Sequence, residues 1–198
     1  SFFMGRSLGG SLRMVRDVIR WFRRKDGPMT TPYAEVGAFL KTDPSLAVPD
    51  IQLHFLIAIV EDHGRAKVPG HGYSCHVCVL RPESRGTVRL ASLDPATAPL
   101  IDPAFLSAPE DLERLKAGVR TMYRILEAPE VQAWGGKDRY PIDLSDDAAL
   151  EALIRARSDT IYHPVGTARM GSDEGAVCDP RLRVRGVEGL YIADASVM

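Results

Sequence analysis

The segment IQLHFLIAIV, residues 51–60, most strongly limits the folds that this chain can adopt. Apolar residues occupy alternate positions from Ile51 to Ile59, and Gln52 and His54 fall between them. A period of two is typical of a β-strand, whose side chains point alternately to two faces. The pattern predicts a strand with one wholly apolar face against a core. Gln52 and His54 are then expected on the opposite face, toward solvent, a covering helix or a cavity.

Other strands are predicted around this one. Residues 73–80 and 87–90 have strand patterns and follow across connections that contain glycine or proline, which favours antiparallel pairing between neighbours. Residues 182–184 and 190–193 are strand-like and flank the turn RGVEG. The sequence therefore predicts a mainly antiparallel sheet.

Three helices are predicted from patterns with a period of 3.6 residues. Residues 11–24 form an amphipathic helix whose arginines we interpret as a solvated face, although a membrane surface or an acidic partner stays open. A second helix begins with Ser107 and Glu110 at capping-box spacing and ends before a proline. A third begins at an N-cap formed by Ser145 and runs to about Arg157.

Length and charge exclude some classes of protein. A chain of 198 residues can bury one sizeable core, so we expect a single domain over residues 1–198. Apolar residues make up 45% and charged residues 26% of the chain, with a formal net charge of -1. This balance is typical of a globular protein and lacks the basic excess that binding to nucleic acid requires.

Cysteine content and hydropathy bear on location. Three cysteines cannot all pair within one chain, so a reducing compartment and a cytoplasmic location are expected, with membrane association of a longer protein left open. No apolar run is long enough for a membrane helix, and no signal-peptide pattern is found at the start. The chain begins at Ser1 and stops at Met198 directly after a strand-like segment, so both ends are expected to be cut.

Two short motifs are weak candidates for a site. The segment CHVC has redox or zinc spacing, but residues three apart on a strand point to opposite faces, so Cys75 and Cys78 are expected to be structural. The segment GHGYSC begins like a dinucleotide fingerprint but lacks the third glycine and leads into a strand. The residues alone therefore form no nucleotide-binding loop.

Residues 161–171, IYHPVGTARMG, contain the histidine best suited to chemistry. His163 stands directly before Pro164, which favours extended backbone, and Gly166 follows at a position suited to a sharp bend. An imidazole changes its charge near neutral pH and can accept a proton from a hydroxyl group. From the residues alone, a catalytic group and an ordinary core or surface histidine both stay open.

This region closely resembles the C-terminal signature of the glucose-methanol-choline (GMC) family of FAD-dependent oxidoreductases. The segments YHPVGTARMG and VCDPRLRVRGVEGLYIADASVM carry the resemblance. It extends through PDIQLHF, VEDHG, HVCVLRPESRGTVRLAS and LIDPAFLSAPEDLERLKAG, which are similar to the alcohol and choline dehydrogenase branch. The resemblance implies an α+β substrate-binding domain, in which a large, mainly antiparallel sheet of about six strands has helices on one face and FAD against the other.

The resemblance also implies roles for individual residues. In the family, the histidine of H-P-V-G-T removes the hydroxyl proton of an alcohol while hydride passes to the flavin, which makes His163 the catalytic base. Ile161 resembles a position whose side chain approaches the flavin, and His54 resembles a pocket histidine, so both are expected to contact the substrate. Asp194 and Ala195 match the stretch that meets the ribityl and pyrophosphate part of FAD. No metal ligand is expected.

The family's dinucleotide fingerprint and its second catalytic residue have no counterpart in the sequence. We therefore expect the substrate-binding portion of a larger FAD-dependent alcohol or choline dehydrogenase or oxidase, inactive without an N-terminal FAD-binding partner portion. The expected reaction converts a primary alcohol, choline-like or aliphatic, to the aldehyde. The sequence does not specify the alcohol, the electron acceptor or the oligomeric state.

Two other interpretations stay open. One is a non-catalytic module that binds a small molecule without flavin, against which the intact H-P-V-G-T and DAS segments speak. The other is a metal-dependent hydrolase that uses His71, His76 and His163 with an aspartate, although these residues lack a recognisable ligand spacing.

Overall fold

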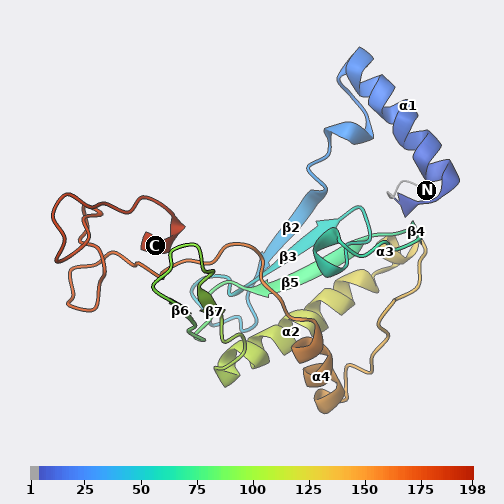
Figure 1. The fold of residues 1–198 in the computed structure, drawn as a ribbon. Helices are drawn as coiled ribbons and strands as arrows, with labels where there is room; N and C mark the ends of the chain where they lie inside the picture. Colours follow the sequence, from blue (N-terminus) through green and yellow to red (C-terminus); the bar gives the residue numbers. More distant parts are fainter. Residues whose placement is uncertain (1–4) are drawn as a thin grey trace. The chain divides into compact units, whose positions relative to one another are not determined.

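The computed structural model describes residues 5–198, so the expected cut end at Ser1 lies outside the described residues. The chain forms two compact units (Figure 1). The first contains the residues up to Arg81 together with Glu110–Ala152, and the second contains Pro82–Pro109 and Leu153–Met198. The expected single domain over residues 1–198 stays a prediction.

The first unit is built around an antiparallel sheet of three strands in the order β2-β3-β5. These strands are β2 (Ala34–Leu40), β3 (Ile51–Leu56) and β5 (Ser74–Val79). The predicted alternation is confirmed, because Ile51 and Leu53 are buried whereas Gln52 and His54 are only half-buried. Strand β3 ends at Leu56, earlier than the predicted end at residue 60.

Helix α2 (Pro109–Leu126) lies along the apolar face of this sheet (Figure 1). Gly118 makes the close approach possible, because a Cβ atom there would lie 2.8 Å from a methyl carbon of Val77 and 3.3 Å from one of Ile51. The predicted helix and its apolar stripe are confirmed, with Leu112 and Val119 buried.

Helix α4 (Asp147–Arg157) was predicted with the wrong cap. The Asp146 carboxylate accepts a hydrogen bond from the backbone N–H of Ala149 at 3.0 Å, so Asp146 is the N-cap. The Ser145 hydroxyl instead donates to Asp143 at 2.6 Å. Both residue types are good caps, and the pattern could not decide between neighbours. A single-turn helix, α3 (Pro129–Gln132), lies between α2 and α4 in the sequence.

Helix α1 (Leu8–Arg24) confirms the predicted amphipathic helix and begins three residues earlier. The Ser7 hydroxyl caps it by accepting a hydrogen bond from the backbone N–H of Gly10 at 3.0 Å. The helix follows β1 (Gly5–Arg6), which pairs with β4 (Gly70–His71). Two short 3₁₀ turns, η1 (Pro28–Thr30) and η2 (Asp62–Gly64), complete this unit.

The second unit contains a two-stranded antiparallel sheet formed by β6 (Thr87–Arg89) and β7 (Leu100–Asp102). Strand β6 was expected to pair with the preceding predicted strand at residues 73–80, but that strand, β5, belongs to the three-stranded sheet, and β6 pairs with β7. The α+β class with antiparallel sheets is confirmed. In the described part of the chain, the strands are divided among sheets of three, two and two.

The last forty residues of the second unit are mostly irregular. The two strand-like segments around RGVEG are linked by hydrogen bonds from Val184 to Leu190 and from Ile192 to Leu182, but they form only isolated bridges. Cys178 is fully buried. The chain ends in a 3₁₀ turn, η3 (Ala195–Val197). No helix among residues 5–198 is long and apolar enough to cross a membrane.

Candidate active site

His163 lies on an irregular segment that bends on both sides of the ring. Before it, the Thr160 hydroxyl accepts a hydrogen bond from the backbone N–H of Tyr162 at 2.9 Å, and Tyr162 has a φ of 68°. After it, Gly166 has a φ of 88°, which only glycine adopts readily. The predicted bend at Gly166 is present, and the His163 side chain is exposed.

The segment that follows His163 is bound to the end of the chain. The backbone N–H of Ala168 donates to the carbonyl of Ser196 at 2.9 Å, and that of Met170 donates to the carbonyl of Val197 at 2.8 Å. The structure therefore brings the ends of the H-P-V-G-T and DAS segments together, although 30 residues separate His163 from Asp194. Both segments belong to the second unit.

Asp194 is the N-cap of η3. Its carboxylate accepts a hydrogen bond from the backbone N–H of Ser196 at 2.8 Å. Hydrogen bonding from Ser196 lowers the pKa of Asp194, so the side chain is anionic at neutral pH. Asp194 and Ala195 are both exposed, as a contact with a cofactor would require.

Arg169 and Asp173 form an ion pair in the segment that follows His163. The Arg169 guanidinium donates two hydrogen bonds to Asp173, at 2.9 and 2.5 Å. This pairing lowers the pKa of Asp173. The carbonyl of Arg169 also accepts from the N–H groups of Val177 and Cys178, at 3.0 and 3.2 Å. Sequence reasoning missed this pair, although a spacing of four residues between arginine and aspartate is a usable signal.

The large side chains next to His163 in the sequence are exposed. Ile161, Tyr162 and Val165 are exposed by 37, 62 and 52%. Such side chains usually pack inside a protein, so their exposure next to an imidazole marks a surface that another group can cover. Apolar side chains, an imidazole and a carboxylate are groups of the kinds that contact the ring and ribityl parts of a flavin. The sequence holds no phosphate-binding loop for the other end.

His54 belongs to the first unit and lies on the face of its sheet opposite Ile51 and Leu53, as the alternation predicts. It pairs across the sheet with His76, and its Nε2 atom lies 3.7 Å from the Cys78 sulfur. The structure thus groups His163, Ile161, Asp194 and Ala195 in one unit and His54 in the other.

The CHVC segment forms part of β5, and its cysteines face opposite sides. Cys75 pairs with Phe55, and Cys78 pairs with Gln52. Burial raises the pKa of the Cys75 thiol to about 11 and also raises that of Cys78, so both are poor nucleophiles at neutral pH. Both are free cysteines. Residues 5–198 hold no group of three or more histidine, cysteine or acidic side chains arranged for a metal ion.

Comparison with known proteins gives consistent matches. Residues 82–198 match the family described as GMC oxidoreductase. An alcohol dehydrogenase [acceptor] of Pseudomonas putida is 43% identical over 178 residues, which cover 89% of this chain and 32% of that protein. The human mitochondrial choline dehydrogenase is 37% identical over 190 residues, which cover 94% of this chain and 32% of that protein. The chain therefore spans about a third of the length of the curated relatives it matches.

Solved structures agree with the sequence matches. A formate oxidase of Aspergillus oryzae RIB40, studied for the modification of its FAD, superimposes with a TM-score of 0.80 at 25% sequence identity. The superposition covers 94% of this chain and 37% of the formate oxidase. Because the match at residues 82–198 covers more than half of the chain, the protein belongs to the GMC oxidoreductase family.

Proposed function

We propose that this chain is the substrate-binding portion of an FAD-dependent oxidoreductase that converts a primary alcohol to an aldehyde, with His163 as the catalytic base. The observation that carries the proposal is the exposed imidazole between two bends, on a segment hydrogen-bonded to Ser196 and Val197. The names of the alcohol and choline dehydrogenase relatives support an alcohol, aliphatic or choline-like, as the substrate. Residues 1–198 would form one domain of the longer enzyme.

His163 would accept the hydroxyl proton of the alcohol at one of its imidazole nitrogens. The alcohol carbon then acquires alkoxide character, which favours the departure of hydride, and loss of both a proton and a hydride leaves the aldehyde. FAD, when bound, supplies the hydride acceptor. The bends at Tyr162 and Gly166 set the course of the backbone on both sides of His163, which supports a fixed starting point for its side chain.

The other site residues would bind and orient. Ile161 is proposed to contact the substrate beside the ring, and His54 is proposed to contact it from the sheet of the first unit. Asp194 and Ala195 are proposed to hold the ribityl and pyrophosphate part of FAD. The Asp194 carboxylate already accepts a hydrogen bond from the backbone N–H of Ser196, which orients the side chain while the residue stays exposed.

The test compares His163→Asn with His63→Asn in the full-length enzyme. The matched control, His63, is an exposed histidine in η2 with a φ of 54°, a conformation that asparagine tolerates. After mixing with alcohol under anaerobic conditions, the flavin of the His163 variant should be reduced about 10²–10⁴-fold more slowly, the usual contribution of a positioned base. The control should keep the wild-type rate.

Flavin content is measured on both variants, so that loss of cofactor is not mistaken for loss of a base. Exogenous imidazole should partly restore the rate of a His163→Gly variant. A His163→Asn enzyme that retains FAD and the wild-type rate of flavin reduction would remove His163 from this role.

A further inference from the structure

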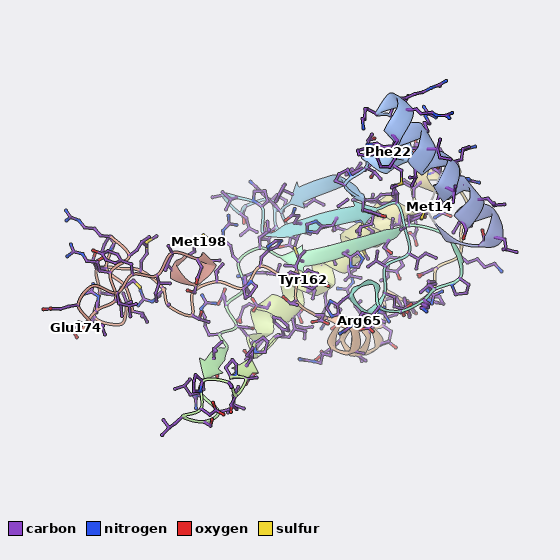
Figure 2. The ribbon with its side chains drawn as sticks, turned by 45° about the horizontal axis from the view of Figure 1, so that its top comes forward. Met14, Phe22, Arg65, Tyr162, Glu174 and Met198 are labelled. Atoms are coloured by element: carbon purple, nitrogen blue, oxygen red, sulfur yellow. The ribbon has the colours of Figure 1, made fainter. Side chains whose placement is uncertain are left out.

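Helix α1 carries a row of large apolar side chains that the described molecule leaves open. They recur at every third or fourth position and therefore follow one line along the helix surface. Their exposure is far above that of a core-facing stripe (Phe22 is labelled in Figure 2). This apolar stripe consists of Leu8, Leu12, Val15, Ile19 and Phe22, which are exposed by 88, 74, 59, 48 and 67%.

Among the described residues of α1, the only buried one lies on the side opposite the apolar stripe. Asp17 is only 5% exposed and lies about halfway around the helix from Leu8, since each residue advances by about 100°. Among the described elements, only β1 and η1 come within 8 Å of α1 between Cα atoms. The apolar stripe thus lies on the side of the helix opposite Asp17, and only its last member, Phe22, lies near η1, beside Met29.

A row of arginines runs parallel to the apolar stripe. Each of its members directly follows a member of the stripe, which places the row about 100° around the helix. Residues 8–25 carry five arginines and one lysine against one aspartate, a net charge of +5 in a chain whose total is -1. Two of the arginines are partly neutralised, Arg16 by Asp17 at 3.0 Å and Arg20 by Asp26 at 2.7 Å. The arginine row consists of Arg13, Arg16, Arg20 and Arg23.

An apolar hollow continues the stripe at the C-terminal end of the helix. It has a volume of about 230 Å³ and is lined by Val18, Trp21, Phe22 and Met29. The Trp21 and Phe22 rings meet edge to face, with centroids 5.0 Å apart. Aromatic rings and arginines at the edge of an apolar face are typical of helices that lie at a membrane interface.

We propose that α1 binds the surface of an anionic phospholipid bilayer, with the apolar stripe among the acyl chains and the arginine row among the lipid phosphates. The helix lies on the bilayer and does not cross it, because its polar side is too charged to enter the hydrocarbon. The hollow beside Trp21 takes part of an acyl chain.

Charge complementarity selects a lipid surface over a protein as the occupant. The basic row flanks the apolar stripe along most of its length, as an interface between hydrocarbon and phosphates requires. A protein groove would have to supply an acidic rim along the arginine row, whereas the phosphates of an anionic bilayer supply that charge along the whole helix.

The experiment measures flotation of the full-length protein with vesicles. Vesicles of phosphatidylglycerol and phosphatidylcholine should carry the protein, and binding should fall as salt is raised from 0.1 to 0.5 M, because the phosphate contacts are screened. Vesicles of phosphatidylcholine alone should bind at least about tenfold less protein. The double variant Leu12→Glu with Ile19→Glu should lower binding to the anionic vesicles by at least about tenfold. The control is Leu90→Glu with Leu93→Glu, at sites exposed by 82 and 98% outside α1, and should bind as the wild type does.

A second variant keeps the proposal testable if the glutamates disturb folding. Arg23→Gln with Arg24→Gln changes only exposed side chains and should weaken both binding and its salt dependence without changing the melting temperature. Three outcomes would overturn the proposal. The first is a wild-type protein that does not bind anionic vesicles. The second is a set of stripe variants that still float with these vesicles. The third is a wild type that binds no lipid together with stripe variants that lose FAD or dissociate from a second copy. None of these outcomes depends on whether His163 is the base.

Discussion

The packing of α2 on the sheet predicts a specific penalty for adding one methyl group at Gly118. The new Cβ atom would lie 2.8 Å from Val77 and 3.3 Å from Ile51, well inside the normal carbon–carbon contact of about 3.5–4.0 Å. Val77 is β-branched and stiff, so the helix or the strand must move. We expect overpacking to cost about 1–3 kcal/mol. The better helix propensity of alanine returns about 1 kcal/mol, which leaves Gly118→Ala destabilised by about 0–2 kcal/mol.

A matched variant isolates the overpacking. Gly9 lies in helix α1, and a Cβ atom there would meet nothing within 4 Å, so Gly9→Ala should gain about 1 kcal/mol. For a protein unit of this size, the two melting temperatures should differ by about 2–12 °C, with Gly118→Ala the lower. The assay is thermal unfolding followed by circular dichroism at one pH. Equal melting temperatures, or a more stable Gly118 variant, would refute the proposed contact between α2 and the sheet.

Two further predictions concern stability. Because Arg169 lowers the pKa of Asp173 below its usual 3.8, the ionised pair stabilises the second unit above that pH and loses its effect as the pH falls through the lowered value. Asp173→Asn should therefore melt below the wild type at pH 7, and the difference should shrink below about pH 4 in melting curves measured from pH 3 to 7; a constant difference would exclude the linkage. At the start of α4, Asp146→Ala should cost about 1 kcal/mol through loss of the cap, whereas Ser145→Ala should cost much less. Urea unfolding of both variants checks the order, and the reverse order would restore Ser145 as the cap.

Periodic segments were predictable from the sequence because burial imposes a repeat on them. The alternation around Ile51 identified β3 and the face of His54, and the stripe through Leu112 and Val119 identified α2. The ends were less predictable, because a helix start depends on which of two adjacent capping residues the chain uses. At α4 that choice fell on Asp146.

Contacts between distant segments were outside the reach of local patterns. The pairing of β6 with β7 spans a connection of ten residues, and no repeat encodes it. The segment after His163 is irregular, so its hydrogen bonds to Ser196 and Val197 carry no periodic signal. The candidate site was identified from its motifs, whereas the ion pair between Arg169 and Asp173 became visible only in the structure.

The most direct test of the account is the pH dependence of flavin reduction in the full-length enzyme under anaerobic, single-turnover conditions. If an imidazole accepts the alcohol proton, the wild-type rate should rise with pH through one ionisation and then level off. The His163→Gln enzyme, with its FAD retained, should be slow and should lack that ionisation. A His163→Gln profile with the wild-type ionisation and height would contradict the claim that this histidine is the base.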